Sequence, residues 1–531
     1  MAVPPLSMSL HASLAKALVR GGLWPATAEP PQLPIDDLAV GNLDLLPLLL
    51  QNLSSRGGLA GEVAGWLADQ QGWGAALTLG YDSRCEAAAR AWLGLRLVWW
   101  PRGRPTGRRI GLASSRLGRR LDRRPDRLAA LRAGCARIDP RRDLLVTAAD
   151  TAAAALVRRA AALFELPLLD IDTMQDDQRG WQPWQERIRQ PPAQNQHLRQ
   201  MILSPTLDGQ PPSEIELAQA APLRDRALVA LSDRLLVFHL RQGGHHHRLL
   251  SHRLTSNRWP PGSVHVAVSG QPVCDPGTAQ LLDAGAVGWL VPKTRHPQGG
   301  PPTGLPAGAE PAAVRSRPPD EGWDYLTHWT RRCDGPWPGQ SEEQYLEELI
   351  LQRPSADRSP LATLRQLIGT RKLLASPQAI RGGTAVVCFT AIPLGQVPQR
   401  RVFRPHRTRW DFEPYGICIR RQWLVQRGAR PVQYGPAELW SALPEAERPF
   451  FQAQQSRTAP RAIDWTAEQE WRHIGDVPLD EVPSEAAFLF VPSHAEAAQL
   501  AKESPWPVVV LAAADQRPAA GSEKPGTSQD R

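Results

Sequence analysis

The chain has 531 residues, of which 42% are hydrophobic and 22% are charged, so its composition excludes a disordered polymer and an integral membrane protein. A chain of this length is expected to form two or three domains. The apolar stretch 43–50 is interrupted by Asp44 and Pro47 and is shorter than the roughly 18 residues of a membrane span. The first residues lack the pattern of a secretory signal. We therefore expect a cytoplasmic protein without a membrane partner.

The net charge of +9 is concentrated in residues 101–142, which contain 14 arginines and three aspartates. Such a basic block is able to bind the phosphates of a nucleic acid, so residues 101–142 predict a nucleic-acid partner. The alternative is a solvated charged surface. The six cysteines form no C-x-x-C pair, which predicts buried, reduced thiols, and we interpret histidines 245–247 as a solvated loop. We therefore expect no metal.

Composition divides the chain into five parts. Residues 1–74 are predicted as a mostly helical extension and residues 75–291 as an α/β domain with a Gln/Pro-rich insertion at 173–222. Residues 292–320 contain eight prolines and four glycines, which predicts a linker. A second domain is expected at 321–512. The polar residues 513–531 predict a disordered tail.

Strands and helices alternate in the first domain. In chain order we expect a strand at 108–115, a helix at 125–135, a strand at 143–149, a helix at 151–165, a strand at 166–172, and further strand-like runs at 227–240, 264–268 and 286–292. This alternation predicts a parallel, doubly wound α/β sheet.

Three segments of this domain carry a resemblance: IGLASSR at 110–116, the stretch 144–169, and SDRLLVFHLRQGG at 232–244. Together they resemble the Rossmann-like nucleotide-binding family of lysine-decarboxylase-like and DNA-processing proteins. The resemblance implies a small-molecule nucleotide as ligand. The residues that it assigns to the nucleotide are Ser114, Ser115, Arg116, Thr147, Asp150, Thr151, Gly243 and Gly244. The turn 147–151 has no glycine, unlike the family pattern, and a scaffold that binds nothing remains an alternative.

In the second domain, the irregular order of strands and helices predicts an α+β fold. We expect a strand around 326–330, helices at 341–352 and 361–376, and strands at 386–394, 415–425 and 430–435. The segments 464–479, 488–493 and 507–512 complete this strand-rich domain. His328 and Thr330 are two residues apart, as are Glu468 and Glu470, so each pair is expected on one face of a strand. Together they predict a small-molecule site.

The segments HWT, YGICI, GARPVQY and EQEWR give this domain a resemblance to the ADP-ribosyltransferase fold, and especially to abortive-infection phage-resistance proteins. The resemblance implies NAD as cofactor and Glu470 as the catalytic carboxylate, with Glu468 beside it. It implies NAD-binding roles for His328, Thr330 and Tyr415. Arg371 and Arg381 are candidates for the pyrophosphate, because arginine makes bidentate contacts with phosphate. A carboxylate facing the ribose would stabilise an oxocarbenium-like transition state.

Two interpretations of the whole chain remain open. In the first, an NAD-using transferase-like effector is fused to a nucleotide-sensing domain and acts in phage defence. In the second, the chain is a non-catalytic regulator that binds a nucleotide or a nucleic acid. His328 is then a core histidine, and Glu470 is a structural ion partner of Arg472. Convergence of His328, Thr330, Tyr415 and Glu470 in one pocket favours the first interpretation, and their dispersal favours the second.

Overall fold

The computed structural model describes residues 8–31, 33, 43–54, 56–81, 84, 86–118, 120–192, 195, 197–207, 221–269, 275–291, 311–317, 322–378, 380–396, 403–404, 409–454 and 465–511. The chain divides into two compact units, Met1–Pro297 with Pro338–Ala356 and Gln298–Trp337 with Asp357–Arg531. Most of the predicted linker and the whole predicted tail lie outside the described residues. Within the described ranges, no helix has the length and apolar character needed to cross a membrane.

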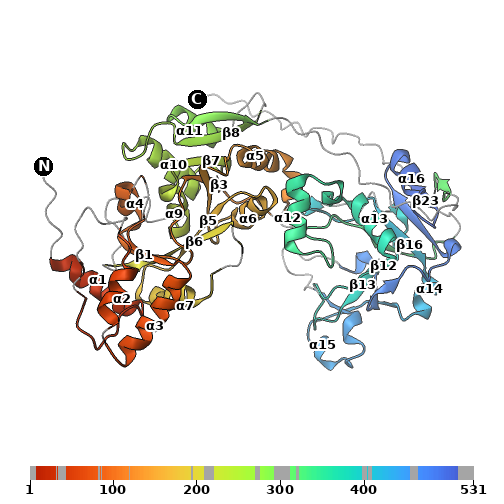
Figure 1. Ribbon diagram of the computed structural model, residues 1–531. Helices are drawn as coiled ribbons and strands as arrows, with labels where there is room; N and C mark the ends of the chain where they lie inside the picture. Colours follow the sequence, from red (N-terminus) through yellow and green to blue (C-terminus); the bar gives the residue numbers. More distant parts are fainter. Residues whose placement is uncertain are drawn as a thin grey trace, which may run out of the picture. The chain divides into compact units, whose positions relative to one another are not determined.

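The described part of the first unit contains a nine-stranded sheet with the order β1-β2-β6-β5-β4-β3-β7-β8-β9 (Figure 1). Its strands are β1 Ala76–Leu79, β2 Arg96–Trp100, β3 Arg108–Ser114, β4 Asp143–Ala148, β5 Leu168–Thr173, β6 Leu198–Thr206, β7 Arg234–His239, β8 Val264–Ser269 and β9 Val287–Val291. The strands from β3 to β9 pair in parallel, whereas β1 and β2 are antiparallel additions beside β6. The predicted α/β domain with a parallel sheet is confirmed.

Helices cover both faces of this sheet. The helices α5 Pro125–Cys135 and α6 Ala154–Leu163 pack on one face, and α4 Glu86–Leu93, α9 Leu223–Leu231, α10 His245–Thr255 and α11 Pro276–Asp283 pack on the other. Every residue of β4 is buried, as expected of a strand covered on both sides. The prediction of a strand over the whole of 227–240 is wrong, because its first part belongs to α9. A fully buried helix shows no polar face, so its apolar run resembles a strand.

The described N-terminal residues include the helices α1 Met8–Arg20, α2 Leu46–Leu53 and α3 Leu59–Gly72. They share a core with β1, β2, β6 and α7 Trp181–Arg189. The segment 173–222 is not simply an insertion, because it supplies α7 and also β6, which lies inside the sheet between β2 and β5. Its Gln/Pro-rich composition conceals the apolar run of β6.

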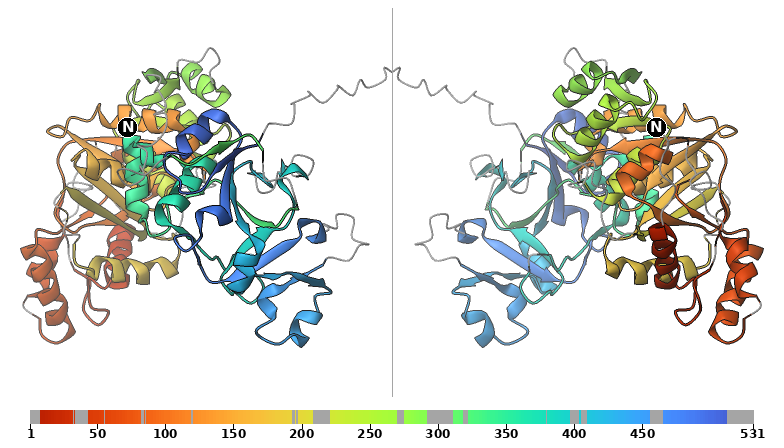
Figure 2. Two further views of the ribbon diagram at one scale, coloured as in Figure 1. Left: turned by 90° about the vertical axis from the view of Figure 1, so that its right-hand side faces the viewer. Right: turned by 90° about the vertical axis from the view of Figure 1, so that its left-hand side faces the viewer.

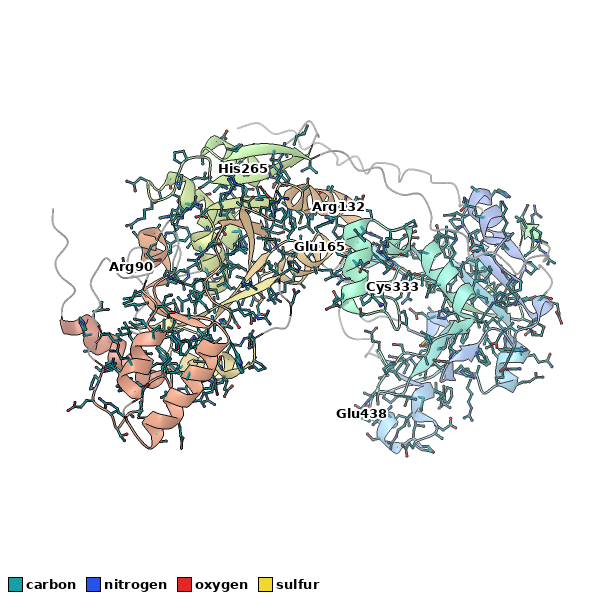
Figure 3. The ribbon with its side chains drawn as sticks, in the orientation of Figure 1. Arg90, Arg132, Glu165, His265, Cys333 and Glu438 are labelled. Carbon is teal, nitrogen blue, oxygen red and sulfur yellow. The ribbon has the colours of Figure 1, made fainter. Side chains whose placement is uncertain are left out.

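One helix beyond the predicted linker belongs to the first unit. This helix, α12 Glu342–Leu351, packs against α5 and α6 (Figure 2). Its buried residues in that core are Tyr345, Leu346, Leu349 and Ile350. Arg159 of α6 forms an ion pair with Glu347. The guanidinium of Arg132, a residue labelled in Figure 3, donates to the Ile350 carbonyl at 2.8 Å. The chain therefore returns to the first unit at 338–356, a segment that the sequence analysis assigned to the second domain.

The described part of the second unit contains an eight-stranded sheet with the order β10-β23-β22-β16-β11-β13-β20-β17. These strands are β10 Val314–Arg315, β11 Tyr325–Trp329, β13 Val386–Thr390, β16 Gly416–Arg420, β17 Arg430–Pro431, β20 Glu470–Ile474, β22 Ala487–Val491 and β23 Val508–Val510. Short strands outside this sheet are β12 Lys372–Leu373, β14 Phe403–Arg404, β15 Arg409–Trp410, β18 Gln433–Gly435, β19 Phe451–Ala453 and β21 Val477–Pro478. Apart from β23, which pairs in parallel with its neighbours, the sheet is antiparallel.

Helices of the second unit pack on one face of its sheet. The helices α13 Pro360–Thr370, α14 Arg421–Gln426 and α16 His494–Leu500 share the core of that face, and α15 Leu439–Ala442 lies outside it. Two predicted boundaries are wrong. The helix predicted at 361–376 ends at Thr370, because Arg371 adopts a φ of +52°. The strand predicted at 415–425 ends at Arg420, where α14 begins.

Candidate functional site

The strand order of the first unit's sheet reverses at β3. From β3 the order runs outward through β4, β5 and β6 on one side and through β7, β8 and β9 on the other. In parallel sheets of this kind, ligands bind outside the carboxyl ends of the strands that flank the reversal. Here these strands are β3, which ends at Ser114, and β7, which ends at His239. The predicted residues Ser115 and Gly244 lie in the loops that follow them.

Hydrogen bonds join the loops after β3 and β7. The Ser115 backbone N–H donates to the His239 carbonyl at 2.9 Å, and the Arg241 N–H donates to Ser115 Oγ at 3.0 Å. Gly244 precedes α10, and its N–H donates to the Arg241 carbonyl at 3.1 Å. A Cβ atom at Gly244 would lie 3.1 Å from that carbonyl oxygen and 3.9 Å from Ser115 Oγ. The structure therefore brings Ser115 and Gly244 together, with Ser114 buried beside them.

A third loop approaches the same edge. A Cβ atom at Gly277, in the first turn of α11, would lie 3.2 Å from the backbone nitrogen of Gln242. Gly243 adopts a φ of +70°, which strains any residue with a side chain. Arg116 and Arg241 are exposed in the loops after β3 and β7. The edge thus combines close backbone approach, the start of α10 and two exposed cations.

The residues predicted after β4 are placed differently from one another. Thr147 lies within β4, is buried, and pairs with Asp170 of β5. Its Oγ1 has no hydrogen-bond partner among the described residues. Asp150 adopts a φ of +60° in the following turn, and Thr151 Oγ1 donates to the Ala148 carbonyl at 2.8 Å. Of the three residues predicted in the turn after β4, only Asp150 and Thr151 therefore lie in a loop at the carboxyl end of the sheet.

His239, the last residue of β7, is a titratable group at this edge. Burial lowers its pKa to about 4, and the positive charge of Arg127 acts in the same direction. The ring is therefore neutral near pH 7.

Histidines 245–247 form the first turn of α10, so the prediction of a solvated loop is wrong. His246 and His247 are buried, and Nε2 of His246 lies 4.0 Å from Oδ1 of Asp225 in α9. Burial lowers the pKa of His246. A Gly-Gly pair is typical of a turn, but here it precedes a helix that packs on α9. In the described ranges, no three His, Cys, Asp or Glu side chains gather as a metal site.

In the second unit, His328 and Glu470 lie on opposite faces of the sheet. Residues that pair across antiparallel strands share a face, and neighbours along a strand alternate. Thr327 pairs with Thr390, and Thr390 pairs with Glu470, so these side chains share one face. His328 follows Thr327 and points to the other face, where its ring centroid lies 5.8 Å from that of Phe389. His328 and Glu470 are therefore separated by the sheet.

Thr330 and Tyr415 are neighbours just beyond the ends of β11 and β16. The Thr330 N–H donates to the Tyr415 carbonyl at 2.9 Å. The Tyr415 hydroxyl donates to Oε1 of Glu496 at 2.9 Å, and burial raises its pKa. His328 Nδ1 lies 3.0 Å from the Cys388 carbonyl oxygen, and burial lowers the pKa of His328. His328 and Tyr415 thus both have protein partners.

Glu470 forms a bidentate ion pair with Arg472. The Arg472 guanidinium donates to the two carboxylate oxygens at 2.9 and 3.1 Å. Arg472 is buried and also donates to the carbonyls of Pro449 and Phe451 at 2.8 and 3.1 Å. The backbone N–H of Glu470 donates to the Tyr434 hydroxyl at 3.2 Å. The carboxylate is therefore the counter-ion of a buried arginine.

Glu468 does not share a strand face with Glu470, contrary to the prediction. It ends the short helical turn Trp465–Glu468, and Gln469 follows with a φ of +45° before β20 begins. The alternation in E-Q-E is typical of a strand, but the turn interrupts it.

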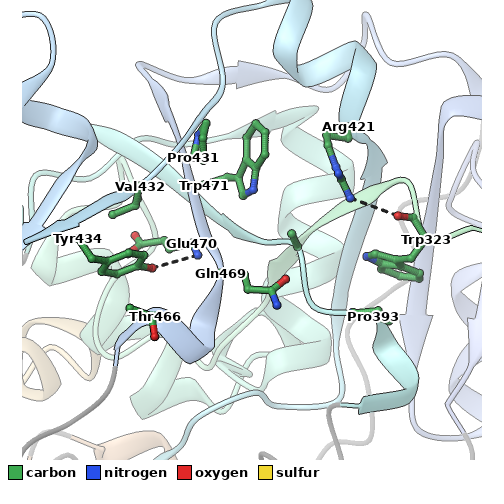
Figure 4. Close-up of a pocket in the computed structure, with 11 residues that line it drawn as sticks. Trp323, Pro393, Arg421, Pro431, Val432, Tyr434, Thr466, Gln469, Glu470 and Trp471 are labelled. Atoms are coloured by element: carbon green, nitrogen blue, oxygen red, sulfur yellow. Dashed lines mark hydrogen bonds between the residues drawn. The ribbon is translucent and has the colours of Figure 1, made fainter.

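A cavity of about 500 Å³ lies beside Glu470 (Figure 4). Its lining consists of Trp323, Ala391, Pro393, Arg421, Pro431, Val432, Tyr434, Thr466, Gln469, Glu470 and Trp471. In the close-up, Tyr434 and Thr466 lie at one end, Arg421 and Trp323 lie at the other, and Trp471 lies between them. The predicted residues His328, Thr330 and Tyr415 are not part of this lining.

The two arginines predicted to bind pyrophosphate contact different parts of the second unit. The Arg371 guanidinium lies 5.7 Å from the ring centroid of Trp506. The Arg381 guanidinium lies 4.6 Å from the ring centroid of Trp440 and donates to the Ala437 carbonyl at 2.8 Å. Neither lines the cavity beside Glu470.

No family model matches the chain, and no curated protein matches it. Sequence reasoning missed His239 and Arg241, which complete the edge around Ser115. The signal for them was one polar residue at the end of a buried strand and another in the loop before Gly-Gly. Sequence reasoning also left open whether Glu470 is catalytic or is the ion-pair partner of Arg472. Opposite charges two residues apart on one strand are the signal for that pair.

Proposed function

We propose that the first unit binds a nucleotide across the carboxyl ends of β3 and β7, and that the chain is a non-catalytic, nucleotide-responsive regulator. One observation carries the proposal: Ser115 and Gly244, from loops on either side of the strand-order reversal, lie against each other. Crevices of this type hold nucleotides in open α/β sheets.

The chemistry of the edge suits a phosphate group. Backbone N–H groups at the start of a helix attract anions, and α10 begins directly after Gly244. The absence of a side chain at Gly243 and Gly244 allows a phosphate to approach the backbone. Arg116 and Arg241 are exposed in the adjoining loops and add positive charge. Nucleotide phosphates are therefore the ligand chemistry that these loops fit best.

The second unit favours the regulatory role over a transferase. The residues assigned to NAD there do not line one cavity, since His328 and Glu470 occupy opposite sheet faces. The carboxylate of Glu470 is also paired with Arg472. His328, Thr330, Tyr415 and Glu470 therefore do not fit one NAD molecule, and we derive no NAD chemistry from them.

The proposal is tested by measuring binding of ATP, ADP, AMP and NAD to the full chain by isothermal titration calorimetry. Gly244→Ala adds a methyl group at the crowded loop, and Arg116→Gln removes an exposed charge. We expect each to weaken binding by about tenfold, the loss of roughly one charge-assisted contact. Ser251→Ala, which removes a hydroxyl on α10 that donates to the His247 carbonyl, serves as the control. Failure of all four nucleotides to bind contradicts the proposal.

The transferase alternative has its own readout. Nicotinamide release from NAD by the full chain, lost in Glu470→Gln while the folded fraction is unchanged, would replace the regulatory proposal. We expect no such release.

A further inference from the structure

A separate cavity of about 270 Å³ lies at the amino-terminal edge of the first unit's sheet. Arg108 begins β3 and Arg234 begins β7. His265, labelled in Figure 3, is the second residue of β8. Arg137 follows α5, and Ile110 and Leu236 complete the lining. Since β3 spans seven residues, this edge is roughly 20 Å from the loops at Ser115. The cavity is therefore distinct from the proposed nucleotide site.

The strand pattern explains why these groups converge. Arg108 and Ile110 are two residues apart on β3, and Arg234 and Leu236 are two apart on β7, so each pair projects from the same face. Ile110 and Leu236 belong to the core that α5 covers. The arginines lie at the strand starts, beside Arg137 at the end of that helix. The cavity thus has an apolar base and a basic rim.

The rim carries more positive charge than its neighbours balance. Arg108 is paired with Asp143 at 2.8 Å. The Arg137 guanidinium lies 4.8 Å from the ring centroid of Trp289. Within the described ranges, neither Arg137 nor Arg234 has a carboxylate at ion-pair distance. Two cations therefore face the cavity without a protein counter-ion from those ranges.

His265 provides an independent indication of a ligand. Its Nε2 is buried and has no hydrogen-bond partner among the described residues. A neutral imidazole carries one N–H, and in its Nε2–H tautomer His265 would donate to a ligand in the cavity. A buried polar atom without a partner is costly, roughly 1–3 kcal/mol, and a ligand in the cavity would supply one. Burial and the charges of Arg234 and Arg137 lower the pKa of His265.

We propose that this cavity binds the phosphate group of a small molecule through Arg137, Arg234 and His265. Arginine contacts phosphate oxygens in a bidentate manner, and two unbalanced guanidinium groups suit a doubly charged anion. Ligand pockets for larger molecules usually occupy roughly 300–1,000 Å³, so about 270 Å³ favours inorganic phosphate or a small phosphate ester over a dinucleotide. Free phosphate and an ester share this chemistry.

Equilibrium dialysis of the full chain with radiolabelled inorganic phosphate, and in parallel with glycerol phosphate, distinguishes the two sources. We expect at least one of them to bind with a dissociation constant of about 1 mM or tighter. The double variant Arg137→Gln/Arg234→Gln should weaken that binding at least about tenfold. Arg234→Lys keeps the charge but not the bidentate geometry, and it should retain part of the affinity.

Arg20→Gln removes an exposed arginine at the end of α1 and should leave binding unchanged. Gly244→Ala should also have no effect here, because it alters only the other edge of the sheet. The inference is therefore testable whether or not the nucleotide site exists. Absence of binding by both probes, or equal binding by the wild type and the double variant, overturns it. A melting temperature of the double variant close to that of the wild type shows that lost binding is not lost folding.

Discussion

Glu470 and Arg472 form an ion pair in which the arginine side chain is 2% exposed and the carboxylate side chain is 18% exposed. Arg472 also reaches the carbonyls of Pro449 and Phe451, so the pair connects β20 to the segment around β19. A buried arginine requires a counter-ion, and Glu470 supplies it. This ion pair gives the Glu470 carboxylate a structural role.

The first prediction concerns the stability provided by this pair. Glu470→Gln leaves Arg472 buried without a negative partner, so we expect a loss of about 3 kcal/mol in the stability of the second unit. Scanning calorimetry of the full chain should show the transition of that unit at a lower temperature. Glu445→Gln makes the same chemical change at an exposed position and should have little effect. Equal shifts in both variants would contradict the structural role.

The second prediction concerns the chain path. A protease site introduced after Gly304 cuts between β9 and α12, yet α12 packs in the core of the first unit. We expect the two fragments to remain associated in size-exclusion chromatography after cleavage. Replacing Leu349 and Ile350 by Asp removes the apolar contacts of α12 and should allow the fragments to separate. The exposed Glu342→Asp change serves as a control. If the fragments separate while Leu349 and Ile350 are still present, α12 does not hold the second fragment to the first unit.

The third prediction concerns pH. The unfolded chain protonates His239 near its ordinary pKa of about 6.5, whereas the folded ring does so only near pH 4. Between these values the unfolded state holds more protons, so stability falls as the pH falls through this window. The slope from one such group is at most about 1.4 kcal/mol per pH unit, and less for a partly exposed ring. His239→Gln should reduce the decline in melting temperature from pH 6.5 to pH 4, and the exposed His197→Gln should not.

The fourth prediction concerns the basic window 101–142. Several of its arginines already have protein contacts, such as Arg108 with Asp143 and Arg127 with the Leu117 carbonyl. We therefore expect only weak binding to duplex DNA in mobility-shift assays. If about three phosphates are neutralised, the logarithm of the affinity should fall with the logarithm of salt at a slope near −3.

The arginines of the window that are exposed around the start of α5 are Arg116, Arg123 and Arg124. Their replacement by Gln should abolish the DNA binding, while Arg127→Gln should lower stability instead. Tight binding that persists at high salt would contradict this prediction, because it would not depend on the neutralisation of phosphates.

Local patterns in the sequence were sufficient for much of the first unit. The strands near 108–115 and 143–149 and the helix at 125–135 are apolar runs with clear ends, and their formation depends mainly on residues close in the chain. The alternation of these elements also determined the α/β class. The same local information failed where two structures share one pattern, as in 227–231, where a buried helix resembles a strand.

The tertiary structure alone decided the strand order, the return of α12 to the first unit and the relation between His328 and Glu470. The positions of His328 on β11 and Glu470 on β20 depend on pairing through β13, which joins residues far apart in sequence. A shift of one residue in that register would move a side chain to the other face. No local pattern contains this information, because register and strand order are set by contacts between distant segments.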